Sequence, residues 1–326
     1  MTLKICIVGA GAIGGWLGAR LALAGHTVSV LARGATLAAL RAQGLRLQTN
    51  GQTQTVPVQA SEQAAVLGVQ DLVIIAVKAP SLLAVARQIA PLMDANTVVL
   101  SAMNGVPWWF FQGFGGPYQG KVLQTVDPRG EIASLIPARQ VLGGVVHASC
   151  ISPEPGRVVH GFGQGLIVGE PSGGASARVQ ALALTLRDAG FDASVSAQIQ
   201  RDIWFKLWGN MTMNPVGALT GANIAQTLAD PLVRAFCSSV MLEASEIGAR
   251  LGLPIAQNPD DRHAVTLKLG AFKTSMLQDV ENGKPLELDA LVAAVRELGQ
   301  LTGVPTPQTD ALLGLTRLMA QMRSLY

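Results

Sequence analysis

The chain has 326 residues, which is long for a single hydrophobic core and suits two packed domains with a cleft between them. Hydrophobic residues make up 49% of it and charged residues only 14%, which argues for large buried surfaces and against disorder. The net charge of +3 is spread along the sequence without basic blocks, so nucleic-acid binding is not expected.

Cysteine usage and hydropathy point to a cytoplasmic protein without a metal. Cys6, Cys150 and Cys237 lie far apart, and they form no metal-ligand spacing with the four histidines. The apolar stretch at 5–25 could be mistaken for a signal peptide or a membrane helix, but its glycines follow a phosphate-loop pattern and it contains Arg20. We therefore expect a cytoplasmic location and no membrane association.

The first part of the chain alternates between strand and helix patterns. Strands are predicted at 4–8, 27–32, 71–77 and 97–102, and helices at 14–24 and 81–92. The runs at 71–77 and 97–102 are almost wholly apolar, which is typical of strands buried on both faces of a sheet. Strands at 141–149, 157–160, 166–168 and 192–196, with a helix at 177–189, complete the predicted sheet.

Beyond residue 198 the strand signals stop, which predicts a domain boundary there and domains at 1–198 and 199–326. Long helical patterns follow at 199–213, 230–251, 264–282 and 288–302. In the first domain, an insert at 107–120 contains WWFFQGFGGPY and is predicted to be a long loop because of its turn residues. It acts either as a lid or as a hydrophobic packing segment, and the sequence favours neither.

A glycine motif lies between the first predicted strand and the first helix. IVGAGAIGG carries GxGxxG at Gly9, Gly11 and Gly14. Here the first glycine makes a tight turn, the second lets a pyrophosphate approach the backbone, and the third lets the helix pack closely. The motif predicts a dinucleotide site.

The order of the predicted strands and helices, together with this motif, indicates the fold class. We expect an α/β protein with an N-terminal Rossmann-type doubly wound sheet and a C-terminal all-helical domain.

The end of the second predicted strand indicates which nicotinamide cofactor binds. NAD enzymes usually place an acid there, but this strand ends in VSVLARG, and Arg33 can pair with a 2′-phosphate instead. NADP is therefore the expected cofactor. Lys78 and Asn104 end the next two apolar strands at the edge where ligands of such sheets bind, although turn formation explains both equally well.

One helix of the second half carries three polar residues on one face. In RDIWFKLWGNMTMNP, Lys206, Asn210 and Asn214 are four residues apart and their neighbours are apolar. A lysine in such surroundings loses solvation, so its pKa is expected to fall toward a range that suits proton donation. The alternative is a lysine that only extends its ammonium to solvent at the domain edge.

A second polar group lies in TSMLQDVENGKPLELDAL. It contains Ser275, Asp279 and Glu287, with a turn predicted at Asn282 and Gly283. Taken singly, each of these residues is explained by a helix surface or a cap. Taken with the glycine loop and the lysine helix, they form a pattern that resembles the ketopantoate reductase family, also called 2-dehydropantoate 2-reductase. The resemblance covers essentially the whole chain, in GAGAIGG, VKA, MNG, HAS, KLWGNMTMNP, SMLQD, ELDAL and GVPTP.

The resemblance implies reduction of 2-dehydropantoate to (R)-pantoate by NADPH in pantothenate biosynthesis. It makes Lys206 the catalytic lysine and proton donor, and Glu287 the family's catalytic glutamate. Substrate positions implied in the same way are Asn104, Lys206, Asn210, Asn214, Ser275 and, after a shift of one residue, Asn223. Implied cofactor positions are Gly9, Ala10, Gly11, Ala12, Ile13, Gly14, Arg33, Lys78, Asn104, Ser149 (through its backbone) and Glu287.

The sequence is compatible with several alternatives. The aromatic insert, Leu288 and the run ALVAAV depart from the family pattern, so a different, bulkier 2-keto acid is compatible with the sequence. Another two-domain dehydrogenase, a histidine-based one using His147 or His160, and a non-catalytic NADP-sensing protein are the other candidates. A homodimer through the helical domain is compatible with the pattern, which does not decide the oligomeric state.

Overall fold

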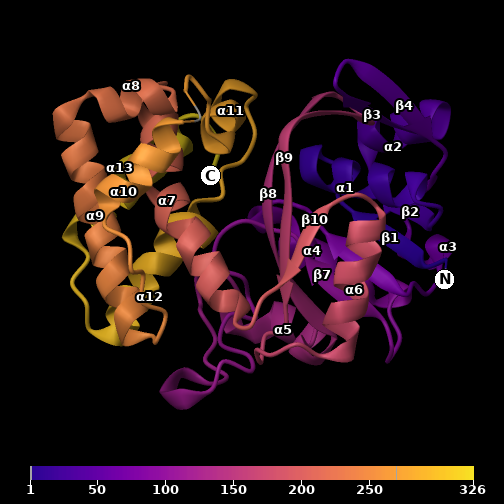
Figure 1. The fold of residues 1–326 in the computed structure, drawn as a ribbon, viewed down its shortest axis with the longest axis horizontal. Helices are drawn as coiled ribbons and strands as arrows, with labels where there is room; N and C mark the ends of the chain where they lie inside the picture. Colours follow the sequence, from indigo (N-terminus) through magenta and orange to yellow (C-terminus); the bar gives the residue numbers. More distant parts are fainter. Residues whose placement is uncertain (1, 269) are drawn as a thin grey trace. The chain divides into compact units, whose positions relative to one another are not determined.

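The computed structural model describes residues 2–268 and 270–326. The chain forms two compact units, and their elements are labelled in Figure 1. The second unit contains Gln200–Tyr326 together with two short segments from the first half, Asn104–Pro107 and Leu123–Pro128. The remainder, up to Ile199, forms the first unit.

The first unit is built on a ten-stranded mixed sheet among the described residues. Its strands are β1 (Lys4–Val8), β2 (Thr27–Leu31), β3 (Leu45–Thr49), β4 (Gln52–Val56), β5 (Gln59–Ser61), β6 (Leu72–Ile75), β7 (Val98–Ser101), β8 (Val141–Glu154), β9 (Arg157–Gly169) and β10 (Asp192–Val195). The parallel run β5-β2-β1-β6-β7-β8 has the strand order of a dinucleotide-binding sheet. The predicted α/β class, with a Rossmann-type sheet and a helical C-terminal part, is confirmed.

Helices of this unit connect the strands. They are α1 (Ala12–Leu23), α2 (Gly34–Gln43), α3 (Ala64–Leu67), α4 (Leu82–Ala86), α5 (Glu131–Leu135) and α6 (Ala177–Asp188), with short 3₁₀ turns at Ala79–Ser81, Ala90–Leu92, Gly116–Tyr118, Pro128–Gly130 and Ala138–Gln140. Helix α1 packs closely on the sheet because Gly15 and Gly18 have no side chains. A Cβ at Gly15 would lie 2.6 Å from Val158, and one at Gly18 would lie 2.8 Å from Ile7. This packing fixes the helix whose N-terminus faces the glycine loop.

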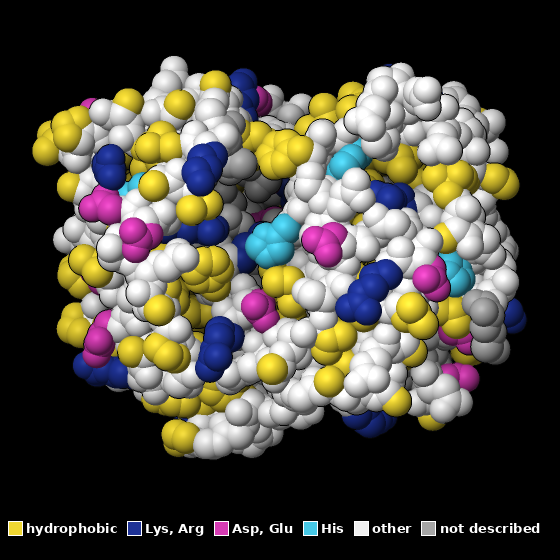
Figure 2. Space-filling view, viewed as in Figure 1, with side chains coloured by type: hydrophobic (Ala, Val, Ile, Leu, Met, Phe, Trp, Pro, Cys, Tyr) yellow, Lys and Arg dark blue, Asp and Glu magenta, His cyan; other side chains and the backbone are white. Residues whose placement is uncertain are grey.

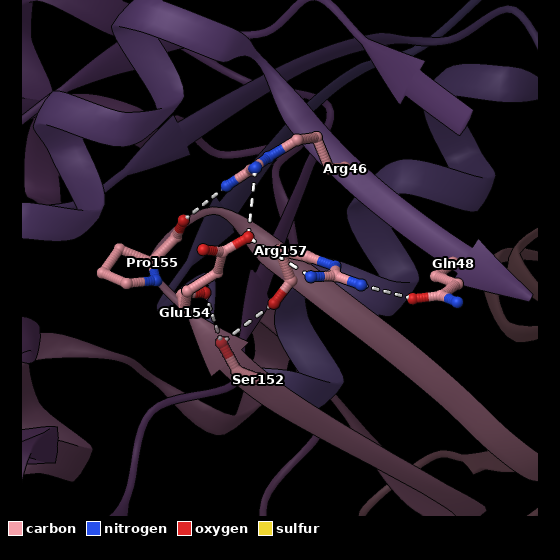
Figure 3. Close-up of polar contacts among 6 residues, drawn as sticks. All are labelled: Arg46, Gln48, Ser152, Glu154, Pro155 and Arg157. Atoms are coloured by element: carbon pink, nitrogen blue, oxygen red, sulfur yellow. Dashed lines mark hydrogen bonds and ion pairs between the residues drawn. The ribbon is translucent and has the colours of Figure 1, made fainter. Parts of the chain in front are cut away.

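Beyond β8 the sheet is mixed, because β9 is antiparallel to β8 but parallel to β3 and β10. Strand β9 is one continuous strand where two short ones were predicted, and it pairs with β8, β3 and β10. The hairpin end of β8 and β9 is held by Glu154, which accepts from Arg46 at 3.2 Å and pairs with Arg157 at 3.5 Å (Figure 3). Arg157 also donates to Gln48 at 2.6 Å, so the three strands are joined by side chains as well as by backbone bonds.

The insert at 107–120 is a loop, as predicted, but its aromatic side chains are core residues. Trp108, Trp109, Phe110 and Phe111 are each at most 3% exposed. Trp109 packs against Gly143 of β8, where a Cβ would come within 2.5 Å of the indole ring. The packing interpretation therefore explains the four aromatics, and the lid interpretation does not.

The second unit is helical. Its helices are α7 (Ile199–Thr220), α8 (Ile224–Ala229), α9 (Pro231–Arg250), α10 (Pro259–Leu267), α11 (Ser275–Glu281), a π-helical turn (Asp289–Ala293), α12 (Ala294–Thr302) and α13 (Pro307–Met322). The single helix predicted at 264–282 is therefore wrong: α10 and α11 are separate helices, and residue 269 of that range lies outside the described residues. Helix α7 continues past its predicted end through Pro215.

The segment Leu123–Pro128 is anchored to this unit by one carboxylate. Glu297 of α12 accepts backbone N–H bonds from Gln124 at 2.7 Å and Thr125 at 2.8 Å, and it also accepts the Thr125 hydroxyl.

Charged side chains of both signs are interspersed on the face of the molecule shown in Figure 2. Of the helices in the described residues, none has the length and apolar character that crossing a membrane requires.

Candidate active site

The glycine motif occupies the turn between β1 and α1, in the form that the sequence predicts. Gly9 has φ +94°, and a Cβ there would lie 2.6 Å from the Val77 side chain. At Gly14 a Cβ would lie 2.0 Å from the Gly9 carbonyl oxygen, whereas nothing lies within 4 Å of the Cβ position at Gly11. The two outer glycines are thus required by packing, and the middle one leaves an open approach to the backbone.

The first turn of α1 is available to an anion. Gly11 is the N-cap and makes no side-chain capping bond, so the first N–H groups of the helix, at Ala12, Ile13 and Gly14, have no intrahelical acceptor. Such groups and the helix dipole favour a phosphate. Ala10, within the loop, is buried. The arrangement can hold a pyrophosphate without any charged side chain.

The two predicted cations lie at the same edge of the sheet. Val8 of β1 is in register with Leu31 of β2 and Ile75 of β6, so the three strands end side by side. Arg33 follows β2 and is exposed at the N-terminus of α2, and no protein group in the described part of the chain binds its guanidinium. Lys78 follows β6 and is partly buried. Both flank the point where the strand order reverses, which is where dinucleotides bind.

Gly11 and Gly14 differ in the space around their Cβ positions, so alanine should affect them differently. We expect Gly11→Ala to fold with unchanged thermal stability but to bind a dinucleotide at least about tenfold more weakly, because its methyl group occupies the phosphate approach. Gly14→Ala should lose both stability and binding, since its Cβ overlaps the Gly9 carbonyl oxygen. Thermal denaturation and fluorescence titration with NADPH measure the two effects. A Gly11→Ala protein that binds normally would remove Gly11 from the site.

In the second unit, Lys206 contacts Asn104. The Lys206 ammonium, on α7, donates a hydrogen bond of 2.7 Å to Asn104 Oδ1. Asn104 follows β7 in sequence but belongs to the helical unit through the segment Asn104–Pro107. Burial lowers the pKa of Lys206 from 10.5 to about 8, and the Glu287 carboxylate opposes part of that decrease. The structure thus brings together three of the predicted site residues around one ammonium group.

Glu287 is placed by an uncommon piece of backbone. It is partly buried and lies two residues before the π-helical turn Asp289–Ala293. The Ala290 carbonyl oxygen in that turn accepts the Val106 N–H at 2.8 Å, which joins the turn to the segment that carries Asn104. π-Helical turns are rare and frequently occur at functional sites. Neither the turn nor its contact with 104–107 was foreseen from the sequence.

The other predicted substrate residues lie farther along α7. Asn210 and Asn214 are one and two turns beyond Lys206, about 6 and 12 Å along the helix axis, and Asn214 is buried. Ser275 is the first residue of α11 and is exposed. Its neighbour Thr274 has its hydroxyl 3.2 Å from the Cβ position of Gly217, so α11 begins beside the Asn214 end of α7.

Asn223 lies near the same end. The Ile224 N–H donates to the Phe272 carbonyl at 3.1 Å, which brings 223–224 beside the start of α11. The Asn223 Oδ1 accepts the Gln226 N–H at 3.0 Å in a capping box of α8. Its oxygen is therefore used in the fold, and only its amide nitrogen is available to donate to a ligand.

The two candidate histidines, His147 and His160, and Ser149 belong to the first unit. His160 is 9% exposed, stacks on Trp16 with ring centroids 5.4 Å apart, and contacts the Gly163 carbonyl oxygen at 2.6 Å. These contacts make it a structural histidine and argue against its use as an acid. His147 and Ser149 lie on β8, which has an irregular register with β9 at these positions. In the described residues, no group of three or more His, Cys, Asp or Glu side chains could hold a metal ion.

The comparisons with known proteins identify the family of this chain. The family model for the ketopantoate reductase PanE/ApbA matches residues 5–115, and that for its C terminal matches residues 198–320. A curated 2-dehydropantoate 2-reductase of Mesorhizobium japonicum is 47% identical over 99% of this chain and 100% of its own length. The chain belongs to the ketopantoate reductase family. It is therefore an oxidoreductase of a family that uses pyridine nucleotides.

Two solved structures extend the similarity to three dimensions. A crystal structure described as a ketopantoate reductase from Ralstonia solanacearum is 62% identical, covers 99% of both chains and has a TM-score of 0.96. A D-mandelate dehydrogenase solved with NADH and anilino(oxo)acetate has the same fold, with a TM-score of 0.85 at 23% identity over 98% of this chain and 99% of the other. The resemblance stated from the sequence motifs is thus confirmed.

Proposed function

We propose that the protein reduces 2-dehydropantoate to (R)-pantoate with NADPH, and that Lys206 donates the proton. The observation that carries this proposal is the Lys206 ammonium, buried enough to lower its pKa to about 8 and held at 2.7 Å by Asn104. Burial would not lower the pKa of an exposed surface lysine in this way. The Mesorhizobium japonicum relative, named 2-dehydropantoate 2-reductase, supports the choice of substrate.

The chemistry needs a hydride and a proton. NADPH supplies the hydride to C2 of the keto acid when it is bound. The carbonyl oxygen becomes negative as C2 is reduced, and the Lys206 ammonium stabilises that charge and gives the oxygen a proton. Asn104 orients the ammonium, and Glu287 favours its charged form. The products are NADP⁺ and the 2-hydroxy acid, and the lysine regains its proton from solvent.

The polar residues along α7 suit the rest of the substrate. We assign Asn210, Asn214 and Ser275 to the carboxylate and hydroxyl groups of the keto acid, with the Asn223 amide as a further donor. The order of these residues along α7 supports the assignment. Lys206 comes first, Asn210 follows one turn later, and Asn214 lies near the start of α11. An acid that places its carbonyl oxygen at Lys206 would therefore extend along one helix face.

NADP is proposed as the cofactor because of Arg33. The strand β2 is followed by an exposed arginine and by no acid, at the edge where the adenosine ribose lies in such sheets. Lys78, the backbone of Ser149 and the glycine loop are assigned to the remaining cofactor contacts. Synthesis of pantoate would place the enzyme in pantothenate biosynthesis, and the three free cysteines suit a cytoplasmic enzyme.

The proposal is tested by following NADPH oxidation with 2-dehydropantoate and a panel of other 2-keto acids, with NADH as the control. Efficient reduction of 2-dehydropantoate with NADPH is expected. Activity on bulkier 2-keto acids alone would keep the mechanism and change the substrate. If NADPH binds but no keto acid reacts, the protein is a sensor and the proposed function is wrong.

The pH dependence follows from the lowered pKa of Lys206. Reduction needs the protonated lysine, so kcat should be constant below about pH 8 and fall about tenfold per pH unit above it. Oxidation of the hydroxy acid needs the neutral amine, so its rate should rise through the same pH range. Initial rates in both directions check the sign. We call the decrease of kcat above about pH 8 the alkaline limb. In Lys206→Arg, the residual activity should lack the alkaline limb because arginine does not titrate in this pH range.

We also propose that the protein is a homodimer that associates through the helical unit. Leu315, Leu318 and Met322 recur at helical spacing on α13 and are 61%, 58% and 79% exposed. Burial of such a stripe favours association. Light scattering after size exclusion should give twice the chain mass, and Leu315→Glu should give a monomer. The control is Leu184→Glu, a substitution of an exposed leucine on α6 in the first unit, which should leave the dimer intact. A monomeric wild type would contradict the proposal.

A further inference from the structure

Gly105 lies directly against the π-helical turn. Its φ is +82°, and a Cβ on it would lie 2.6 Å from the Ala290 oxygen and 2.7 Å from both the Ala290 carbonyl carbon and Cβ. Only one of these three atoms belongs to a side chain, so the obstruction cannot rotate away. The next residue, Val106, donates its N–H to the same Ala290 oxygen at 2.8 Å. The segment and the turn thus meet backbone to backbone, which requires glycine.

This contact lies between two groups that act on Lys206. Asn104 directly precedes Gly105 and accepts the hydrogen bond of the Lys206 ammonium. Glu287 precedes Ala290 by three residues and acts electrostatically on the same ammonium. A displacement at the contact between Gly105 and Ala290 would therefore move a hydrogen-bond acceptor, a carboxylate, or both. Proton transfer is sensitive to such displacements, because a shift of about 1 Å can cost about 100-fold in rate.

We propose that Gly105 and the π-helical turn Asp289–Ala293 form a positioning device that holds Asn104 and Glu287 around the Lys206 ammonium, with Gly105 as the positioning residue. The inference rests on the proposed role of Lys206 as proton donor. Gly105 touches neither the transferred proton nor its donor. Its contribution is the close approach of two backbones, and Ala290 contributes by being small.

The expected effect of Gly105→Ala follows from the geometry. The new methyl group must push the segment Asn104–Pro107 off the turn, so the Asn104 oxygen withdraws from the ammonium. We expect kcat to fall at least about tenfold. Water replaces the withdrawn group, and since burial is the main cause of the lowered Lys206 pKa, the alkaline limb of kcat should move upward by about one pH unit. A loss of folding alone would not move that limb.

The control is Gly252→Ala in the same unit. Gly252 has φ +78°, close to that of Gly105, but nothing lies within 4 Å of its Cβ position. Both variants carry the strain of an alanine at positive φ, and only one carries the collision. Gly252→Ala should lower the thermal midpoint and leave the pH limb of kcat in place. If both variants keep that limb and lose kcat equally, the positioning role is wrong.

Two further measurements keep the test independent of folding and of the proposed function. Ala290→Val enlarges the other side of the contact without backbone strain at 105, and it should shift the pH limb in the same direction. NMR titration of ¹³C-labelled lysine, assigned with Lys206→Gln, follows the ammonium without any substrate. If the wild type reduces no keto acid, the proposed function fails. An unchanged Lys206 titration in folded Gly105→Ala and Ala290→Val overturns the positioning role alone.

Discussion

Lys206→Ala should lower kcat for keto-acid reduction by about 10²- to 10⁴-fold, which is the range that a positioned general acid contributes. The alanine can neither donate a proton to the developing alkoxide nor stabilise its charge. NADPH affinity should change little, because the predicted phosphate contacts lie in the glycine loop and at Arg33. Stopped-flow rates with saturating NADPH separate the chemical step from binding.

Two controls make this result specific. Lys4→Ala removes an exposed lysine from the start of β1 and should leave kcat unchanged. Small primary amines added to Lys206→Ala should restore part of the rate, because they can enter the space that the side chain leaves. The thermal midpoint should not fall, since the substitution removes a charge whose burial is unfavourable. Lys206→Ala with more than about a tenth of the wild-type kcat would exclude the lysine as proton donor.

Arg33→Ala should weaken NADPH binding by about tenfold and leave NADH binding unchanged. The guanidinium can form two charge-assisted hydrogen bonds to a 2′-phosphate, and its exposure keeps their contribution near 1.4 kcal/mol, which is about a factor of ten. Isothermal titration with 2′,5′-ADP and 5′-ADP isolates the phosphate. The ratio of the two affinities should approach one in the variant.

The matched control for this prediction is Arg41→Ala. Arg41 lies at the far end of α2, is exposed, and donates to the Ala60 carbonyl. It should leave both affinities unchanged. Equal weakening of 2′,5′-ADP and 5′-ADP binding in Arg33→Ala would show that Arg33 supports the loop and does not select NADP.

The sequence predicts best where one local pattern decides the structure. β1, β6 and β7 are short apolar runs that end in a glycine or a polar residue, and all three form central parallel strands. β3 and β4 were not predicted, because LRLQT and QTQTV are polar and lie toward an edge of the sheet, where pairing decides. The insert was ambiguous because burial of four aromatics depends on partners such as Gly143, far along the chain.

In the candidate site, too, local sequence patterns predict some features, and others depend on contacts between distant residues. The common face of Lys206, Asn210 and Asn214 follows from helix periodicity, and the lowered pKa of the lysine follows from its apolar neighbours. The contact between Asn104 and Lys206 joins residues 102 positions apart, and no local pattern predicts it. The Asn-Gly pair at 104–105 indicated a turn, but its fit against Ala290 depends on a π-helical turn that has no signal in the sequence.

The assignment of Asn104–Pro107 and Leu123–Pro128 to the helical unit limits how members of this family can be recombined. The chain passes between its two units at 103/104, 107/108, 122/123, 128/129 and 199/200. A chimaera joined near residue 199 would inherit Lys206, Glu287 and Ala290 from one parent but Asn104, Gly105 and Thr125 from the other. Exchange of substrate preference between relatives therefore requires transplanting three separate pieces of gene, because a single crossover divides the contacts around the ammonium.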